Sequence, residues 1–291
     1  MKARERMNTF GKPSDVFTLQ NGTEIPCLGF GTWRARDGEE AYGSVLAALR
    51  AGYRHIDTAA YYGNETSVGR AVRDSGIDRR EIFITSKVWA SDRGYETTKA
   101  AMGRTLEALG VDCVDLYLIH WPASPSRFAD WDEINLASWR AMTELYREGC
   151  ARAIGVSNFL PHHLESLVKA DVSPMVNQIE YHPGYLQSET VDYCRAHGIL
   201  VEAWSPLGRG RIFEHPLLLE MSARYGRSIA QICIHFCLRN GILPLPKSVT
   251  PARIIENTAV FDFELTEDDM TSLREMAPCG YSGRHPDEVD F

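Results

Sequence analysis

The chain has 291 residues, a length that suits one α/β barrel, and its 44% hydrophobic and 24% charged residues are typical of a globular protein with a large core. Its formal net charge of −8 argues against non-specific nucleic-acid binding, which basic proteins favour. The polar start lacks the apolar stretch of a secretory signal, and no apolar run approaches the roughly 18 residues of a membrane span.

The cysteines indicate a reducing compartment. Seven are present, an odd number, with neither a C-x-x-C pair nor zinc-like spacing. Cys233 and Cys237 are four residues apart in an apolar helical stretch, and we interpret them as core thiols rather than as a ligand pair. We therefore expect a cytoplasmic protein without a membrane or nucleic-acid partner.

The first predicted element is a β-hairpin over 16–26 (VFTLQNGTEIP), because Asn21-Gly22 stands between two alternating runs. Short apolar strands follow, and amphipathic segments lie between them. These segments carry apolar residues at spacings of three and four, and three of them stop at Gly52, Gly110 or Gly149, as helix C-termini do. Strands are predicted at 27–30, 54–56, 82–86, 114–119, 151–156, 176–179, 200–203 and 242–245.

Strands that alternate with helices indicate parallel βαβ units. Eight such units in a chain of this length favour a (β/α)₈ TIM barrel over the alternative, an open doubly wound sheet. No linker or low-complexity segment divides the chain. We therefore predict one α/β barrel domain over residues 1–291, with 1–15 as a polar N-terminal extension before the hairpin.

The doubly wound alternative can be tested on its glycine motif. A Rossmann site needs G-x-G-x-x-G after the first strand, for a tight turn and close approach to a pyrophosphate. Arg34 stands where the third glycine of the first candidate belongs, and Phe213 stands there in the second candidate. Neither segment supports a Rossmann site.

Polar residues stand where the predicted strands end. In a closed barrel, the chemistry gathers at the carboxyl ends of the strands. Ionisable residues directly after apolar strands are unusual, and three of complementary charge, Asp57, Lys87 and His120, indicate a functional cluster rather than separate structural groups. The other strands end at Ser157, Asn158, Gln178, Trp204, Lys247 and Ser248.

These residue types point to proton transfer. An ammonium is costly to bury alone, but an adjacent carboxylate offsets that cost. A Lys87–Asp57 pair near a tyrosine would favour the phenolate and lower the tyrosine pKa. Tyr62 lies five residues after Asp57, on the loop at the same barrel end, so we predict that it gives or takes the proton. Spacing alone leaves Tyr61 as a competitor.

A metal site is the competing interpretation of His55-x-Asp57, since His and Asp at strand ends also bind metals in hydrolytic barrels. The strand period of two would point both side chains the same way. However, no second His-x-His cluster is present, and a central lysine would repel a cation. We expect no metal.

The segment from Pro246 to Asn257 predicts a phosphate site. Thr250 followed by Pro251 is typical of a helix start, where free N–H groups favour an anion. Lys247 before the helix and Arg253 inside it add full charges, and an arginine commonly accepts the 2′-phosphate of NADP. A solvated basic helix end is the alternative.

Eight segments taken together resemble the aldo-keto reductases, from about Phe17 to the C-terminus. Each of these segments is short, but all stand in order and at barrel spacing. They are LGFGTW (28–33), HIDTAAYYGNE (55–65), ITSKVW (84–89), YLIHWP (117–122), IGVSNF (154–159), NQIEYHP (177–183), WSPLGRG (204–210) and LPKSVTPARIIEN (245–257).

The resemblance implies a barrel that binds extended NADPH/NADP⁺ without a Rossmann motif. It places a catalytic tetrad on Asp57, Tyr62, Lys87 and His120, and the tyrosine directly before G-N-E selects Tyr62 over Tyr61. The implied cofactor contacts are Thr32, Trp33, Asp57, Ser157, Asn158, Gln178, Trp204, Ser205, Leu207, Lys247, Ser248, Val249, Thr250, Arg253, Glu256 and Asn257.

The resemblance also implies a reaction, in which hydride passes from the nicotinamide to a carbonyl carbon while Tyr62 protonates the oxygen. Family members that reduce steroid double bonds carry glutamate at the position of His120, so we expect carbonyl reduction. Phe128 is a further, weaker candidate for the pocket. The implied substrate contacts are Trp33, Tyr61, Trp89, His120 and Trp121.

The loop after Trp204 and the tail beyond Met276 are short, which is similar to the smaller microbial branch that includes diketogluconate reductases and a prostaglandin F synthase. A clamp over the cofactor is therefore not expected. Candidate substrates are small aldehydes and ketones, sugar-derived dicarbonyls, methylglyoxal and prostaglandin H2. We expect a monomer. The competing functions are an NADP(H)-sensing subunit without turnover and a metal hydrolase.

Overall fold

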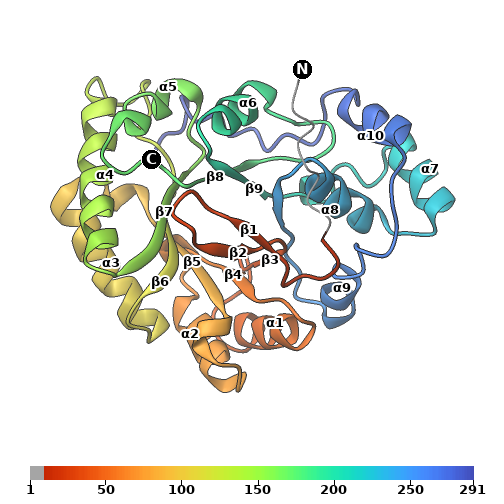
Figure 1. Cartoon of the computed structure of the whole chain (residues 1–291), viewed down its shortest axis with the longest axis horizontal. Helices are drawn as coiled ribbons and strands as arrows, with labels where there is room; N and C mark the ends of the chain where they lie inside the picture. Colours follow the sequence, from red (N-terminus) through yellow and green to blue (C-terminus); the bar gives the residue numbers. More distant parts are fainter. Residues whose placement is uncertain (1–9) are drawn as a thin grey trace.

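Eight parallel strands form one sheet in chain order, from β3 to β10, and helices surround it (Figure 1). This fold is taken from a computed structural model that describes residues 10–291. The predicted (β/α)₈ barrel and its N-terminal hairpin are confirmed. Residues 1–9 of the predicted polar extension lie outside the described residues.

The strands lie within two residues of the predicted bounds. The hairpin strands are β1 (Val16–Thr18) and β2 (Glu24–Pro26). The barrel strands are β3 (Gly29–Gly31), β4 (His55–Asp57), β5 (Phe83–Val88), β6 (Val114–Ile119), β7 (Ala151–Ser157), β8 (Val176–Glu180), β9 (Leu200–Trp204) and β10 (Leu243–Leu245).

The helices cover the outside of the barrel, and left-handed glycines follow the three helices for which they were predicted. Gly110 has φ 64°, Gly52 φ 97° and Gly149 φ 81°. The helices are α1 (Glu39–Arg50), α2 (Glu65–Asp74), α3 (Tyr95–Leu109), α4 (Trp131–Arg147), α5 (Pro161–Leu164), α6 (Ser188–Ala196), α7 (Pro216–Tyr225), α8 (Ile229–Arg239), α9 (Pro251–Glu256) and α10 (Glu267–Arg274). No helix within residues 10–291 is long and apolar enough to cross a membrane.

The barrel closes where β3 meets β10. The backbone N–H of Gly31 donates to the carbonyl of Pro246 at 3.0 Å. Glycine is needed here because a Cβ on Gly29 would lie 2.3 Å from a methyl of Leu245, and a Cβ on Gly31 would lie 3.3 Å from the Leu245 carbonyl oxygen. These glycines therefore allow the first and last barrel strands to approach each other.

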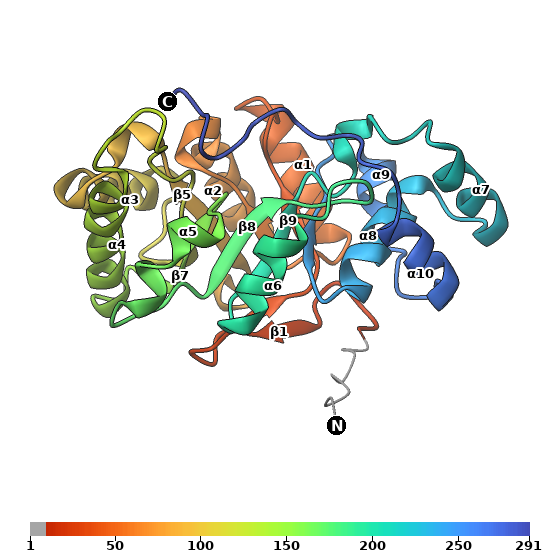
Figure 2. The same ribbon diagram turned by 90° about the horizontal axis from the view of Figure 1, so that it is seen from above.

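The hairpin and the C-terminal segment lie on opposite sides of the barrel (Figure 2). Gly22 has φ 84°, which the turn between β1 and β2 requires. The side chains of Gln20 and Asn21 donate to the carbonyls of Pro174 and Arg152, at 2.7 and 3.0 Å. The hairpin is thereby fixed to the amino-terminal ends of the barrel strands, leaving the carboxyl ends for the site.

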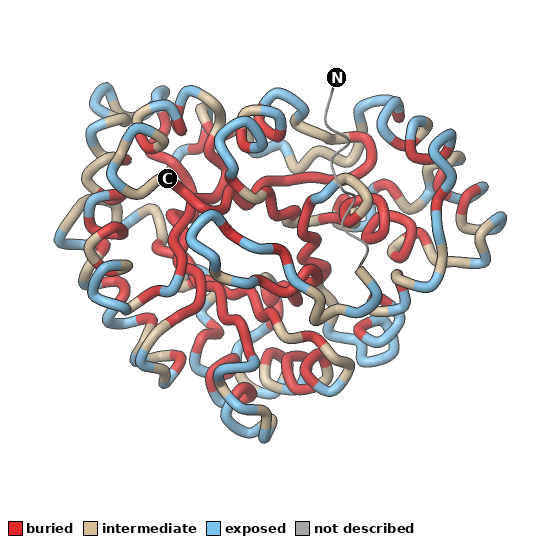
Figure 3. Tube along the Cα trace, in the orientation of Figure 1, coloured by how far each residue is buried: buried red, intermediate tan, exposed pale blue. Residues whose placement is uncertain are grey.

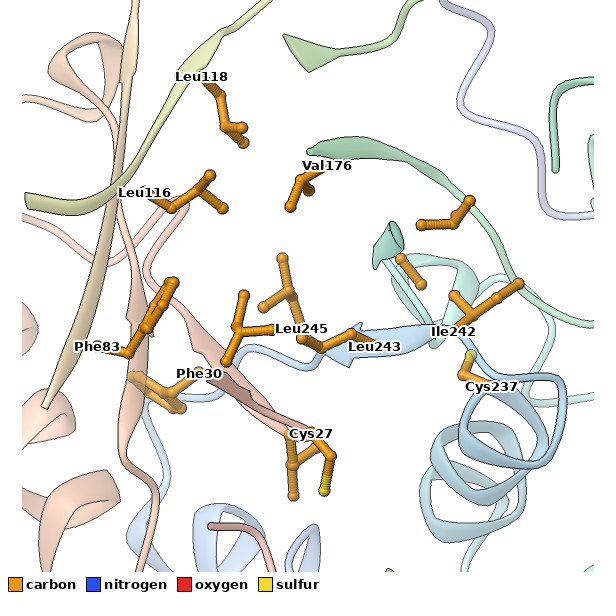
Figure 4. Packing of buried hydrophobic residues seen from close by; sticks show 14 of the residues in the cluster. Cys27, Phe30, Phe83, Leu116, Leu118, Val176, Cys237, Ile242, Leu243 and Leu245 are labelled. Carbon is orange, nitrogen blue, oxygen red and sulfur yellow. The ribbon is translucent and has the colours of Figure 1, made fainter. Parts of the chain in front are cut away.

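Every second residue of each barrel strand points inward, and these side chains fill the barrel interior. The strands are buried and the outward helix faces are exposed (Figure 3). Phe30, Leu116, Leu118, Val176 and Leu245 belong to one apolar cluster at the centre of the molecule (Figure 4). Because successive strand residues point to opposite faces, the same alternation determines which polar side chains enter the barrel mouth.

Candidate active site

The charged cluster predicted at the strand ends is present. Asp57 is the last residue of β4, Lys87 lies near the end of β5, and His120 directly follows β6. All three are buried, and the Lys87 side chain is 0% exposed. Asp57 and Lys87 extend β4 and β5 past the predicted ends because they bond to each other inside the mouth, so burial does not leave these two charges without partners.

Lys87 is the centre of this cluster. Its Nζ donates to both carboxylate oxygens of Asp57, at 2.7 and 2.8 Å, and to the carbonyl of Thr58 at 2.9 Å. It also lies 3.3 Å from the hydroxyl of Tyr62. Burial alone would lower the pKa of Lys87, but the Asp57 carboxylate and Tyr62 outweigh it and raise that pKa. The ammonium is therefore charged at the site.

The pKa of Tyr62 moves opposite to the sequence prediction, which was a lowered value. Burial raises the pKa above its ordinary value of 10, and the Asp57 charge adds to this, while Lys87 opposes both. The prediction weighed the ammonium but not the loss of water around the phenol, which disfavours phenolate. Tyr62 therefore keeps its proton at neutral pH.

His120 is a neutral imidazole in this site. Burial holds its pKa well below the ordinary value, and the charge of Lys87 lowers it further. The ring lies 5.6 Å from that of Tyr62, between centroids, and its Nδ1 is buried without a hydrogen-bond partner among residues 10–291. A neutral ring offers one N–H donor and one acceptor, which suits it to hold a polar ligand atom.

A second carboxyl group, Glu202 on β9, continues the network and was missed from the sequence. The amide of Gln178 donates to Asp57 and to Glu202, each at 2.8 Å. Burial raises the pKa of Glu202 to about 8, with Asp57 adding to the shift. The feature of the sequence that could have indicated Glu202 is that it is the single glutamate in the otherwise apolar run VEAW. It lies two residues before Trp204 and therefore on the same side of the strand.

Neighbouring polar residues hold one edge of the site rigid. Trp204 Nε1 donates to the side-chain oxygen of Asn158 at 2.8 Å, and the Asn158 amide donates to the carbonyl of His120 at 3.0 Å. The hydroxyl of Ser157 donates to the carbonyl of Gln178 at 2.7 Å. Asn158 has a left-handed φ of 64°, a conformation that asparagine tolerates better than most residues.

A cleft of about 1110 Å³ opens over this cluster. Most of the residues predicted to take part in catalysis or to contact the cofactor or substrate line this cleft. Lys87 does not line it, because it is fully buried beneath Tyr62. Thr32 does not line it either, and its hydroxyl donates to the Asp57 carbonyl at 3.0 Å. Val249 and Thr250 are exposed outside its lining. Predicted residues that line it are Trp33, Asp57, Tyr61, Tyr62, Trp89, His120, Trp121, Ser157, Asn158, Gln178, Trp204, Ser205, Leu207, Lys247, Ser248, Arg253, Glu256 and Asn257.

Aromatic residues form one wall of the cleft. Trp89 stacks on Tyr61 with ring centroids 3.7 Å apart, and lies 5.1 Å from the ring of His120. Phe291 also lines the wall, 4.9 Å from Trp89 and 5.5 Å from Trp121. Phe291 was not predicted, because it is remote in sequence from every motif, and only the path of the tail brings it here.

Phe128, the weaker candidate of the sequence analysis, does not line the cleft. It lines a separate shallow depression and lies against Arg93 and Arg127, whose guanidinium carbons are 5.8 and 5.5 Å from its ring centroid. The loop after β6 therefore carries its aromatic ring away from the cluster.

The end of the cleft at which a phosphate site was predicted is basic. Lys247 lines it before α9, and Arg253 lines it from that helix, which begins with Pro251 at its first turn. Thr250 occupies the N-cap position, as predicted, but its hydroxyl does not cap the helix. Instead the Thr250 N–H donates to the hydroxyl of Ser248 at 3.1 Å.

Arg34 and Arg209 are two further cations that sequence reasoning missed. Their guanidinium carbons lie 4.5 and 4.7 Å from the ring centroid of Trp33. Arg209 also lies 5.3 Å from the Trp204 ring. The loop after β9 is short, as predicted, yet its arginine side chain reaches across to the loop after β3.

His55 and Asp57 do not converge on a shared metal position. His55 is fully buried, and its Nε2 lies 2.8 Å from the hydroxyl of Thr85. Burial, with the nearby charge of Lys87, lowers the pKa of His55 to about 3. Because Asp57 is engaged by Lys87, the pair is part of the hydrogen-bonded interior of the barrel.

Within residues 10–291, a group of side chains close enough to hold a cation comprises His162, His163 and Asp287. The N–H of Leu160 donates to Nδ1 of His163 at 3.1 Å, and burial beside His162 lowers the pKa of His163 to about 3. The neutral ring thus carries its proton on Nε2, which lies 3.0 Å from Asp287. We interpret this group as an anchor for the C-terminal segment.

The family model for the aldo/keto reductase family matches residues 27–278. The chain belongs to the aldo-keto reductases. It is 46% identical over 278 residues to a glyoxal reductase of Bacillus subtilis, covering 95% of this chain and 98% of the relative. It is 46% identical over 274 residues to a 9,11-endoperoxide prostaglandin H2 reductase of Trypanosoma cruzi, covering 93% and 94%.

Among solved structures, this aldo-keto reductase is similar to a Gox0644 mutant in complex with NADPH. The TM-score is 0.88 at 36% identity, with 96% of this chain and 99% of the other covered. The matched region contains β3 to α10, and so every strand that carries the charged cluster. The resemblance expected from the eight sequence segments is thereby confirmed.

Proposed function

We propose that this aldo-keto reductase reduces small aldehydes and ketones to alcohols with NADPH, and that Tyr62 is the general acid. The observation that carries the proposal is the position of the Tyr62 hydroxyl, 3.3 Å from Nζ of Lys87 and beside the neutral His120. A phenol that keeps its proton at neutral pH can donate it to the oxygen of a carbonyl.

The cleft suits NADPH in size and in charge. Trp204 offers a ring face, and Ser157, Asn158 and Gln178 present polar groups beside it, an arrangement that fits the nicotinamide and its carboxamide. Lys247 and Arg253 fit the 2′-phosphate at the other end. When bound, NADPH supplies the hydride that reduces the carbonyl carbon.

The residues of the chain supply the proton and its control. The N–H of a neutral His120 orients the carbonyl oxygen toward Tyr62, which gives up its proton as charge develops there. The ammonium of Lys87 stabilises the phenolate that remains, and Asp57 keeps that ammonium charged. The aromatic wall excludes water from the reacting groups.

Within this reaction class we propose small dicarbonyls, such as methylglyoxal or a sugar-derived dicarbonyl, as substrates. The name of the B. subtilis glyoxal reductase supports them. Prostaglandin H2 is a second candidate, supported by the name of the T. cruzi relative. We further propose that the protein is a cytoplasmic monomer. Light scattering would test this by measuring its mass in solution.

The test compares Tyr62→Phe with Tyr61→Phe, two substitutions that each remove one hydroxyl from neighbouring tyrosines. With methylglyoxal and NADPH, we expect Tyr62→Phe to lose about 10²–10⁴ in kcat, because general acid catalysis contributes that much. Tyr61→Phe should stay within a few fold of wild type. NADPH binding, followed by quenching of tryptophan fluorescence, should be retained in both.

Turnover by Tyr62→Phe at nearly the wild-type rate would show that Tyr62 is not the general acid. A wild-type protein that binds NADPH but consumes none with any carbonyl of a broad panel would instead be a cofactor sensor, the competing function considered from the sequence.

A further inference from the structure

Glu202 and Gln178 are neighbours on adjacent strands of the barrel. The register of β8 and β9 pairs Gln178 directly with Glu202, so both side chains point to the same face of the sheet. Both residues are buried, at 2% and 0% exposed. Gln178 lines the cleft, but Glu202 is not part of its lining. Any effect of Glu202 on a molecule in the cleft is therefore indirect.

Glu202 is poorly compensated for so deep a position. Among residues 10–291, its Oε2 accepts from Gln178 at 2.8 Å, and its Oε1 is buried without a hydrogen-bond partner. A buried carboxyl group with one partner is costly, and an apolar side chain at the same place would avoid that cost. The bond to Gln178 is thus what this carboxyl group contributes.

Two acceptors determine which way the Gln178 amide faces. Its Nε2 lies 2.8 Å from Oδ2 of Asp57 and 2.8 Å from Oε2 of Glu202. Asp57 is paired with the ammonium of Lys87, so an amide oxygen in the place of Nε2 would meet a negative charge. An amide nitrogen carries two hydrogens, one for each of these oxygens. The two bonds together fix both the direction and the plane of the amide.

This orientation leaves the amide oxygen of Gln178 as a free acceptor. Among residues 10–291, Oε1 of Gln178 accepts no hydrogen bond, and it is not enclosed in the interior. In the neighbouring Asn158 side chain, by contrast, the amide oxygen already accepts from Nε1 of Trp204. The cleft therefore offers the Gln178 oxygen to an N–H of a bound molecule.

The carboxamide of nicotinamide ends in an NH₂ group, which needs such an acceptor. We propose that Glu202 is a positioning residue for the cofactor, which holds the Gln178 amide so that its oxygen faces the cleft and accepts from this NH₂ group. Without Glu202, Gln178 keeps one bond, to Asp57, and its amide can rotate about that bond. This inference rests on the proposed function, because it needs a nicotinamide cofactor in the cleft.

The experiment compares two cofactors that differ at one group. In the 3-acetylpyridine analogue of NADP⁺, a methyl group replaces the carboxamide NH₂. Glu202→Met removes the acceptor and keeps the length of the side chain. We expect it to raise Kd for NADP⁺ about fivefold, which corresponds to about 1 kcal/mol for one hydrogen bond. Kd for the analogue should change by less than twofold. Quenching of tryptophan fluorescence measures both constants without turnover.

Three variants serve as controls. Glu202→Gln keeps an acceptor oxygen, so both constants should stay within twofold of wild type. Asp115→Asn alters a buried carboxyl group of β6 that is bonded to Arg79 and Arg152 outside the cleft lining, and it should leave the ratio of the two constants unchanged. Adding Glu202→Met to Gln178→Met should change that ratio no further, because the effect of Glu202 passes through Gln178.

Equal weakening of both cofactors by Glu202→Met would show that Glu202 only packs the barrel, and would overturn the proposal. A loss in Glu202→Gln as large as in Glu202→Met would overturn it too. A further measurement needs no variant. In the wild-type protein, NMR should show both side-chain amide hydrogens of Gln178 protected from exchange with solvent. Exchange of either one at the rate of a free amide would overturn the proposal.

The binding measurement also separates this proposal from the proposed function. Selective weakening of NADP⁺ by Glu202→Met supports the positioning role even where no carbonyl is reduced, a result that would overturn only the reductase. Turnover by the wild type together with equal weakening of both cofactors by Glu202→Met would overturn the positioning role alone.

Discussion

Tyr62 and Glu202 show how burial sets protonation in this mouth. Both groups lose water, and both have a raised pKa, so each keeps its proton at a higher pH than in solution. Tyr62 keeps a proton that it can donate. Glu202 keeps one that prevents a second negative charge beside Asp57, to which it is linked through Gln178.

The raised pKa of Glu202 predicts how the stability of the folded protein depends on pH. A carboxyl whose pKa rises on folding, here to about 8, stabilises the fold fully below its unfolded pKa and loses this contribution as pH rises toward 8. Glu202→Gln removes the ionisation. We expect the free energy of unfolding of the variant, relative to wild type, to increase between pH 5 and 8, by at most about 1.4 kcal/mol per pH unit.

Urea denaturation at several pH values measures this difference. Glu24→Gln is the matched control, because Glu24 is exposed on β2. A constant difference between Glu202→Gln and wild type across the range would mean that Glu202 is already ionised in the folded protein.

The positions of the charged residues could be predicted from the sequence, but their states could not. Asp57, Lys87 and His120 each follow an apolar run, so strand periodicity brings them to one mouth. The direction of the Tyr62 pKa depends on how much water the folded loops exclude. Glu202 was missed because one glutamate within a strand has no spacing partner to mark it.

Among the elements, the strands were predicted well because their apolar runs are bounded by turns and glycines. The ends of β4 and β5 were predicted too early, since polar residues normally end a buried strand. Here the register pairs Asp57 with Thr85 and Lys87 with Leu118, so the ladder continues through residues that satisfy each other. Pairing across strands is information that no single segment carries.

Gly155 on β7 tests how tightly neighbouring strands pack. A Cβ there would lie 2.5 Å from the carbonyl oxygen of Val176 on β8, which is backbone and cannot move aside. We expect Gly155→Ala to lower the free energy of unfolding by about 1–3 kcal/mol, as overpacking does. Chemical denaturation followed by circular dichroism measures this loss.

Gly103→Ala is the control for Gly155→Ala. Gly103 lies inside α3 with no atom near the position of a Cβ, so alanine there should stabilise the protein by about 0.5–1 kcal/mol. Equal stability for Gly155→Ala and wild type would show that β7 and β8 can separate at this point.

Across the whole molecule, the positive charges that line the cleft are separated from the excess of negative charge elsewhere. The chain carries a net charge of −8, yet the cleft is lined by Arg34, Arg209, Lys247, Arg253 and Arg284. Arg253 is the residue that we assign to the 2′-phosphate. We expect Arg253→Ala to raise KM for NADPH at least tenfold while KM for NADH changes by less than threefold, because only NADPH has this phosphate.

Steady-state kinetics with both cofactors at low and high salt measures this difference, which salt should reduce. Arg274→Ala serves as the control, since Arg274 is an exposed residue of α10 outside the cleft. Equal losses for NADPH and NADH in Arg253→Ala would remove the phosphate assignment.

The C-terminal segment is bonded to the connections that follow β5, β6 and β7 and to the last residue of β8, and this has a consequence for how such an enzyme diversifies. Its residues shape the entrance, yet none of them belongs to the barrel strands that hold Asp57, Lys87 and Tyr62's supporting loop. Substitutions in the segment can therefore alter which molecules enter without disturbing the groups that transfer the proton. Part of the cleft entrance and the groups of the charged cluster therefore come from different parts of the chain.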